Sequence, residues 1–279
     1  HVMRGEEFIA STPKFLSLYD ALEIPYPIFV TLPPIMGPDG KKKLSKRDGA
    51  KDLLEYKADG YLPEALANFL ALIGWNPGTE QELFNPEELI SAFTLEKIQR
   101  SGGAFNEEKL KWMNKEYLKK LSSAKLAEYI EPSLPTSVTD LPQYTTSKLE
   151  KFAPIMIERV HNKIEITETA ETGEYSWAFS EPEYDTDLIK WKNDDSPQQS
   201  LPRLKKVLEL LETADFGSIE GIKAAIWPYA EEVGKGEVLW PLRVTLTGRE
   251  RSPDPFTCAW ILGEEETMKR VESACVKIK

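Results

Sequence analysis

The residues with the clearest chemical potential form one short basic segment, Lys41 to Lys51. Six of its eleven residues are positively charged, although the 279-residue chain has a formal net charge of −11. Positive charge concentrated against the trend of the whole chain favours an anionic ligand. Gly40 and Gly49 allow tight turns that bring backbone N–H groups close to such a ligand. With Ser45, the segment suits a polyphosphate, and a solvated lysine-rich surface is the alternative.

The sequence before the basic segment predicts a strand and a helix. Residues 28–32 are β-branched and aromatic, and the turn-rich stretch 33–40 follows them. Upstream, Ser11 and Pro13 are typical of a helix start. We expect this helix to end near Leu22. A strand that ends in a charged loop is where α/β folds place phosphate chemistry, so we expect the last part of a doubly wound sheet here.

Beyond the basic segment the apolar residues recur at helical spacing, so the body of the chain is expected to be mainly α. Pro63 opens a helix that Gly74 ends, and capping residues open others at Asn85, Thr94 and Asn106. The Pro-, Ser- and Thr-rich stretch 132–147 predicts a linker or a long connection. Further helices are expected around residues 149–160, 204–211, 222–229, 256–262 and 268–275.

The composition excludes several classes of site and protein. The two cysteines, Cys258 and Cys275, have no metal-ligand spacing, and two histidines, His1 and His161, cannot support a zinc cluster or a Ser–His–Asp arrangement. The longest uncharged stretch, residues 65–79, is too short to span a membrane. The acidic net charge argues against a nonspecific duplex binder. The first residue is not Met, which suggests a piece of a longer protein.

Five blocks of the chain resemble, in order, segments of the bacterial-type glutamyl-tRNA synthetases, which are class I aminoacyl-tRNA synthetases. Lys43-Leu44-Ser45-Lys46-Arg47 stands where the class carries its KMSKS loop, and Arg47 replaces the final Ser. The HIGH motif of the class is absent, so the first half of the catalytic domain is missing. The five blocks are His1–Glu7, Lys43–Arg47, Phe105–Asn114, Glu181–Tyr184 and Val238–Gly248.

The resemblance implies a mainly α fold in four parts. A remnant of a Rossmann-type α/β catalytic domain begins the chain, and a helical stem-contact region follows it. The remainder is implied to be an all-α anticodon-binding domain of two helical subdomains. The corresponding ranges are residues 1–45, 46–125, 126–195 and 196–279.

The resemblance also implies a reaction. Glutamate and ATP give glutamyl-adenylate and pyrophosphate, and glutamate then passes to the tRNA 3′ end. Lys43 and Lys46 are suited to neutralise the leaving pyrophosphate, and Ser45 can donate a hydrogen bond. Leu44 and Arg47 complete the implied ATP-binding segment.

Three residues outside the basic segment acquire roles from the same resemblance. Arg4 is implied to bind the glutamate side chain, because a guanidinium forks onto a carboxylate with fixed geometry. A salt bridge to Glu6 or Glu7 is the alternative for Arg4. Glu7 is implied to help to hold ATP. The alternative is that Glu7 is an exposed acidic residue beside a helix. Arg159 is a candidate for reading an anticodon base, and an ordinary surface arginine is its alternative.

The implied partners are tRNA-Glu, with tRNA-Gln left open, and ATP and glutamate through the missing catalytic half. ATP would arrive with Mg²⁺ as a substrate complex, and no metal or prosthetic group is expected within this chain. A cytoplasmic monomer without membrane contact is expected. A noncatalytic helical RNA-binding or assembly module is the alternative function. A polyphosphate-binding ATPase is remote, because the chain lacks GxxxxGK[ST].

The basic segment generates a kinetic prediction. In the full-length enzyme, Lys46→Ala should slow adenylate formation far more than it weakens glutamate binding, because the lysine meets charge that develops only in the transition state. The loss is expected to be roughly 3–4 kcal/mol of transition-state stabilisation. ATP–pyrophosphate exchange measures it, and an unchanged exchange rate would remove Lys46 from the mechanism.

Overall fold

A computed structural model describes residues 1–45, 50–192 and 194–279. The chain divides into two compact units. Unit 1 comprises residues 1–120 and 161–164, and unit 2 comprises residues 121–160 and 165–279. Within the described ranges, none of the helices combines the length and apolarity that crossing a bilayer requires.

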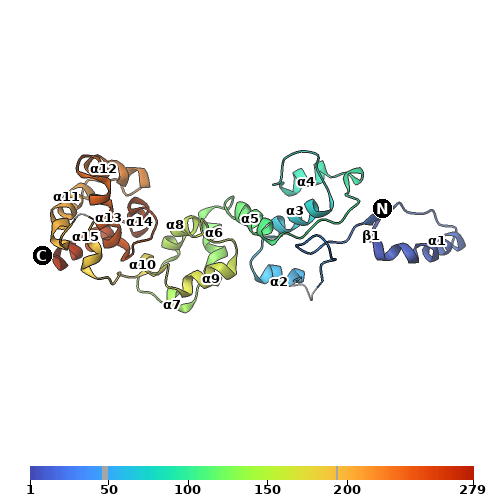
Figure 1. The fold of residues 1–279 in the computed structure, drawn as a ribbon, viewed down its shortest axis with the longest axis horizontal. Coiled ribbons are helices and arrows are strands. Elements are labelled where there is room, and N and C mark those ends of the chain that lie inside the picture. Colours follow the sequence, from blue (N-terminus) through green and yellow to red (C-terminus); the bar gives the residue numbers. More distant parts are fainter. Residues whose placement is uncertain (46–49, 193) are drawn as a thin grey trace. The chain divides into compact units, whose positions relative to one another are not determined.

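Unit 1 begins with a small βαβ arrangement. The strands β1 (Val2–Gly5) and β2 (Phe29–Leu32) pair in parallel, with Val2 opposite Phe29. The 3₁₀ helix η1 (Glu6–Ser11) and the helix α1 (Thr12–Ala21) connect them (Figure 1). The predicted strand and helix are therefore confirmed.

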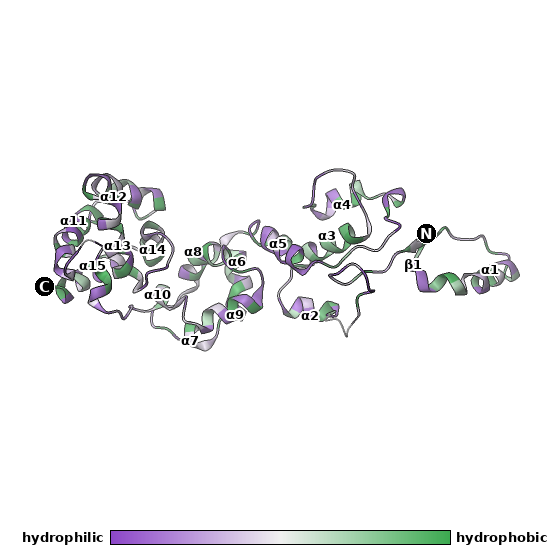
Figure 2. Cartoon of the chain, viewed as in Figure 1, coloured by the Kyte–Doolittle hydropathy of each residue, from purple (hydrophilic) through white to green (hydrophobic). Residues whose placement is uncertain are grey.

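The apolar side chains of α1 are not buried. The helix contains no buried residue, and Leu18 is 55% exposed. In Figure 2, α1 shows hydrophobic residues although none of its residues is buried. Indeed, none of residues 1–36 is buried. Helical spacing predicted the correct element, but it could not predict whether a neighbour covers its apolar face.

The core of unit 1 lies between α3 and α5. The Phe105 ring packs edge to face against Phe69 and at a tilt against Tyr56, together with Leu110 and Met113. Leu70 of α3 is 39% exposed, although it shares the helix with the buried Leu66, Phe69 and Ile73. The expected helix at Thr94 is a three-residue 3₁₀ turn. The elements are α2 (Leu53–Ala58), α3 (Pro63–Gly74), α4 (Pro86–Ala92), η3 (Leu95–Lys97) and α5 (Glu107–Leu118).

Unit 2 is helical throughout its described residues. In its second half, α11, α12, α13, α14 and α15 pack against one another (Figure 1). The expected linker 132–147 contains short helices, and Val138 within it is buried, so it is a packed connection. The first elements are α6 (Ser123–Ile130), η4 (Glu131–Ser133), α7 (Thr136–Thr139), α8 (Thr146–Met156), α9 (Lys163–Glu171), α10 (Ser176–Phe179) and η5 (Thr186–Ile189). The later elements are η6 (Pro197–Ser200), α11 (Leu201–Leu211), α12 (Ile219–Val233), α13 (Lys235–Thr247), α14 (Pro255–Leu262) and α15 (Glu264–Lys277).

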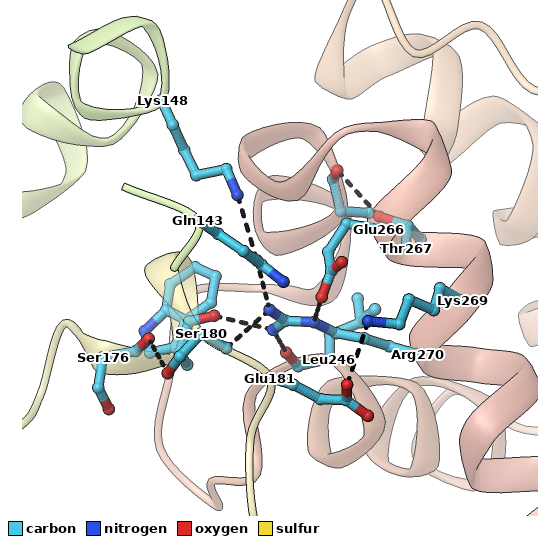
Figure 3. A network of polar contacts seen from close by, with 12 residues as sticks. Gln143, Lys148, Ser176, Ser180, Glu181, Leu246, Glu266, Thr267, Lys269 and Arg270 are labelled. Carbon is cyan, nitrogen blue, oxygen red and sulfur yellow. Dashed lines mark hydrogen bonds and ion pairs between the residues drawn. The ribbon is translucent and has the colours of Figure 1, made fainter. Parts of the chain in front are cut away.

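A buried guanidinium joins segments of unit 2 that are distant in sequence (Figure 3). Arg270 of α15 donates to the carbonyl oxygens of Trp177 (2.8 Å), Leu246 (2.5 Å) and Ser180 (2.8 Å). It also donates to Gln143 Oε1 (3.2 Å), and its Nε pairs with Glu266 Oε1 at 2.6 Å. These contacts engage all five N–H groups of the side chain, which is 1% exposed.

The charges of this network support one another. Burial lowers the pKa of Arg270, but the hydrogen bond with Glu266 opposes that change. Burial alone would raise the pKa of Glu266, but hydrogen bonds from Gln143 and Arg270 outweigh burial and hold that pKa below its usual value. The pair is therefore charged near neutral pH.

Arg270→Met should strongly destabilise unit 2. The substitution leaves three carbonyls without a donor and Glu266 without its partner, and breaking a buried pair in this way costs about 3–5 kcal/mol. Arg270→Lys should be intermediate, because an ammonium has three donors without the planar fork. Urea unfolding followed by circular dichroism measures both effects.

Lys269→Met is the matched control for this prediction. Lys269 precedes Arg270 in α15, but its side chain is 56% exposed and pairs with Glu181 at the surface. We expect its unfolding midpoint to stay close to that of the parent chain. Equal effects at positions 269 and 270 would refute the role assigned to Arg270.

Candidate functional site

The base of the basic segment is a short antiparallel pairing. Met36 and Lys43 lie opposite each other. The Gly37 N–H donates to the Lys42 carbonyl at 2.7 Å, and the Leu44 N–H donates to the Ile35 carbonyl at 2.8 Å. The intervening turn includes Gly40, whose φ of +66° is left-handed and therefore favours glycine.

A second segment of unit 1 holds this pairing in place. The Met36 N–H donates to the Gly103 carbonyl at 3.0 Å, and the Phe105 N–H donates to the Met36 carbonyl at 2.9 Å. The approach depends on Gly102, where a Cβ atom would lie 2.2 Å from the Pro34 carbonyl oxygen. The side chain of Leu44 packs against the core of unit 1. The base of the segment is thus fixed by backbone bonds and by an apolar anchor.

The described charges of the segment fall into two groups. Lys41, Lys42 and Lys43 are exposed. Lys51, in contrast, pairs with Asp59 at 2.6 Å, and the hydrogen bond with that carboxylate raises the pKa of Lys51. Lys51 thereby contributes to the start of α2 rather than to a free basic surface.

The candidate site lies only partly within the described residues. Ser45 is exposed, and its carbonyl accepts a hydrogen bond from the Ala50 N–H at 3.2 Å. The predicted ATP-binding residues Lys46 and Arg47 lie outside the described residues. Among the predicted residues, Lys43, Leu44 and Ser45 are therefore the ones with described positions. They present an exposed cation and a hydroxyl on either side of a partly buried leucine, an arrangement suited to an oxyanion.

Arg4 lies on β1 and contacts aromatic rings. Its guanidinium carbon is 5.2 Å from the centre of the Phe8 ring and 4.7 Å from that of Phe15. Within the described part of the chain, Arg4 makes no ion pair with Glu6 or Glu7. The salt-bridge alternative is therefore not what the structure contains. Stacking orients the planar group and leaves its N–H edge available for a carboxylate.

Glu7 is exposed in η1, directly after β1. Its carboxyl group folds over Gly5, where a Cβ atom would lie 2.3 Å from Glu7 Oε2. Arg4 and Glu7 therefore lie in consecutive elements, Arg4 in β1 and Glu7 in η1. The structure does not give a direct contact between either of them and Lys43.

Arg159 follows α8 in unit 2 and belongs to a three-residue charge cluster. Its NH1 lies 3.2 Å from Glu174 Oε1, and Arg249 NH1 lies 3.0 Å from Glu174 Oε2. Sequence reasoning missed Glu174 and Arg249. Arg249 directly follows the Val238–Gly248 block, and that position was the available signal.

Among the described residues, there is no group of three or more His, Cys, Asp or Glu side chains that could hold a metal ion. The exposed cations of the basic segment are instead suited to an anion that arrives with its own counter-ion.

Comparison with protein families divides the chain into two matched parts. Residues 1–112 match the catalytic domain of the class I tRNA synthetases for E and Q, that is, glutamate and glutamine. Residues 125–275 match an anticodon binding domain. The first match contains the basic segment with Arg4 and Glu7, and the second contains Arg159, Glu174 and Arg249.

Curated relatives match over the whole chain. The glutamate–tRNA ligase of Clostridium novyi is 38% identical over 286 residues, which cover 100% of this chain and 57% of the relative. The Clostridium tetani ligase is also 38% identical, over 100% of this chain and 56% of its own length. The chain thus spans a little more than half the length of these relatives.

Solved structures give the same result. A glutamate tRNA ligase from Elizabethkingia meningosepticum, in complex with its amino acid, superposes with a TM-score of 0.74 at 30% identity, covering 100% of this chain and 57% of that one. Glutamate-tRNA synthetase from Elizabethkingia anophelis gives a TM-score of 0.72 at 30% identity, with 99% and 56% covered. The chain belongs to the class I glutamyl-tRNA synthetase family, and it carries that family's anticodon binding domain together with part of its catalytic domain.

Proposed function

We propose that this chain is the tRNA-recognising and ATP-phosphate-binding portion of a ligase that attaches glutamate to tRNA-Glu through glutamyl-adenylate. The single observation that carries the proposal is the anchored basic segment within a catalytic-domain match that an anticodon binding domain follows.

The basic segment acts on the phosphates of ATP. Lys43 and Ser45 meet the pyrophosphate that leaves, with Lys46 and Arg47 beside them in sequence. Leu44 takes part through its backbone, because its side chain packs against the core of unit 1. The ATP would enter with Mg²⁺ as its own counter-ion, so the chain need not hold a resident metal.

Arg4 and Glu7 act at the amino-acid and nucleotide ends of the same site. Arg4, stacked on Phe8 and Phe15, receives the side-chain carboxylate of glutamate through its free N–H edge. Glu7 follows directly in η1 and contributes to ATP binding. The glutamate complex of the Elizabethkingia meningosepticum relative supports an amino-acid site in this family.

The remaining residues recognise tRNA. Residues 1–45 form the end of the catalytic domain, and residues 46–125 contact the acceptor stem. Residues 126–195 and 196–279 form two anticodon-binding subdomains, with Arg159 reading an anticodon base. The partner is tRNA-Glu, with tRNA-Gln as a second substrate to be tested, and the protein is proposed to be a cytoplasmic monomer.

Arg4→Gln tests the amino-acid assignment in the full-length enzyme. The substitution removes the charged fork, so the KM for glutamate should rise at least about tenfold, which corresponds to roughly 1.4 kcal/mol. The KM for ATP should stay nearly constant. Steady-state ATP–pyrophosphate exchange gives both constants, and equal changes in the two would contradict the assignment.

The isolated 279-residue chain should give no ATP–pyrophosphate exchange. None of residues 1–36 is buried. The catalytic part therefore offers an open surface rather than the closed, water-excluding site that adenylate formation needs. The complete Clostridium novyi ligase, assayed at the same concentration, is the positive control. Exchange above background by the isolated chain would show that these residues suffice for catalysis.

A further inference from the structure

One carboxylate in unit 2 lies between two guanidinium groups. Glu174 Oε2 accepts from Arg249 NH1 at 3.0 Å, and Glu174 Oε1 accepts from Arg159 NH1 at 3.2 Å. The two bonds differ in exposure. The side chains of Arg249 and Glu174 are 30% and 28% exposed, whereas that of Arg159 is 57% exposed. Glu174 and Arg249 thus form the sheltered half of the cluster, and Arg159 is its solvent-facing end.

The backbone fixes the sheltered half. Arg249 follows Gly248, whose φ of +66° ends α13, and the Arg249 N–H donates to Thr247 Oγ1 at 3.3 Å. Arg249 NH2 also donates to the carbonyl of Gly173 at 2.6 Å. Its guanidinium therefore bonds to two successive residues, Gly173 and Glu174. A planar fork held at two points leaves the carboxylate little rotational freedom.

The solvent-facing end lies at an aromatic pocket. Arg159 and Glu174 line this pocket together with Phe152, Tyr175 and Trp177. The Phe152 ring packs edge-on against Tyr175 and Trp177, with ring centres 5.6 Å and 5.2 Å apart. These side chains therefore form a rigid apolar wall beneath a guanidinium.

The pocket also contains a polar group without a protein partner. Tyr175 is 4% exposed, and its hydroxyl makes no hydrogen bond of ordinary geometry with the described residues. Burial raises the pKa of Tyr175 to about 12, although the nearby Thr169 hydroxyl tempers the increase. The group is thus a neutral O–H near pH 7. A buried hydroxyl of this kind favours a ligand that carries its own hydrogen-bonding atoms.

From this geometry we infer that Glu174 is a positioning residue, which holds Arg159 over the Tyr175 pocket in the orientation that discriminates one anticodon base. A guanidinium with free N–H groups can hydrogen-bond to an unstacked base, and the packed aromatic rings beside Arg159 give it a rigid support. The inference rests on the proposed function, because it requires that Arg159 reads a base. The inference adds that Arg249 anchors Glu174, which in turn orients Arg159.

The negative charge of Glu174 distinguishes a role in positioning Arg159 from a role in attracting RNA. Glu174 is negative, so it repels the phosphates of RNA and cannot raise general affinity. Its bond to Arg159 occupies one of five N–H groups and leaves the others for a base. Removing its charge should therefore leave nonspecific affinity equal or greater and should lower discrimination between bases. A role in fold stability alone would change both affinities together.

The test uses the 279-residue chain and a tRNA-Glu transcript. Three further transcripts each carry one changed anticodon base. Dissociation constants are measured at fixed salt concentration. For each anticodon position, the constant for the changed transcript divided by that for the unchanged transcript is the preference ratio. The variants are Glu174→Gln, Arg249→Lys and Arg159→Gln. The matched control is Glu171→Gln, which removes one exposed negative charge from the end of α9 without touching either arginine.

Glu174→Gln should lower the preference ratio about tenfold at one anticodon position, the same position that Arg159→Gln affects. Its affinity for the changed transcript should equal or exceed that of the parent chain. Arg249→Lys should reproduce this loss, because lysine cannot bond to Gly173 and Glu174 as a fork. Arg249→Lys also serves as the independent variant if circular dichroism shows that Glu174→Gln is misfolded.

The outcomes separate the inference from the proposed function. If Arg159→Gln lowers the ratio while Glu174→Gln and Arg249→Lys preserve it, the positioning role is wrong and the base-reading role of Arg159 stands. If Arg159→Gln changes no ratio, both fail. A loss of equal size in Glu171→Gln would attribute the effect to net charge and would also overturn the inference.

Discussion

The geometry of unit 2 depends on the saturated guanidinium of Arg270. This group lies against the carbonyls of Trp177 and Ser180, which follow Glu174 in sequence, and against that of Leu246, which precedes Arg249. It therefore fixes both backbone segments whose side chains form the Glu174–Arg249 bond. A buried cation with every donor engaged permits one arrangement of these segments, because any shift would leave a buried polar group unpaired.

In unit 1, backbone hydrogen bonds hold the basic segment in place. Its basic segment carries charge that must remain exposed, so the charged side chains cannot themselves anchor it. The anchor is the pairing of Met36 with Lys43 and with Gly103–Phe105, aided by Leu44 in the core. Glycine at position 102 is required because the Pro34 carbonyl occupies the space of a side chain. Leu44 therefore anchors the segment, whereas the adjacent Lys43 and Ser45 remain exposed.

Four arginines of the chain differ in what surrounds them. Arg270 is enclosed and structural, Arg249 is half-sheltered and bonds to one carboxylate, and Arg159 and Arg4 retain N–H groups toward solvent. Arg4 is oriented by two aromatic rings, whereas Arg159 is oriented by Glu174. For both Arg4 and Arg159 the protein fixes one side of a planar cation and leaves the other side for an anionic or polar ligand.

The sequence by itself determined most of the local elements of the chain. Caps at Asn85 and Asn106, Pro63 and the apolar run before the basic segment predicted helices and a strand that the structure contains. Ordered blocks pointed to the family. These signals act over a few residues, where spacing and capping depend on the backbone alone.

Only the tertiary structure decided which charges face one another and which apolar faces are covered. Glu174 and Arg249 are 75 residues apart, and Arg270 and Gln143 are 127 residues apart. The stretch 132–147 was likewise predicted only as a linker or a long connection, and the structure shows that it is packed. Periodicity reveals which side of an element is apolar, but the partner of that side depends on how distant segments meet.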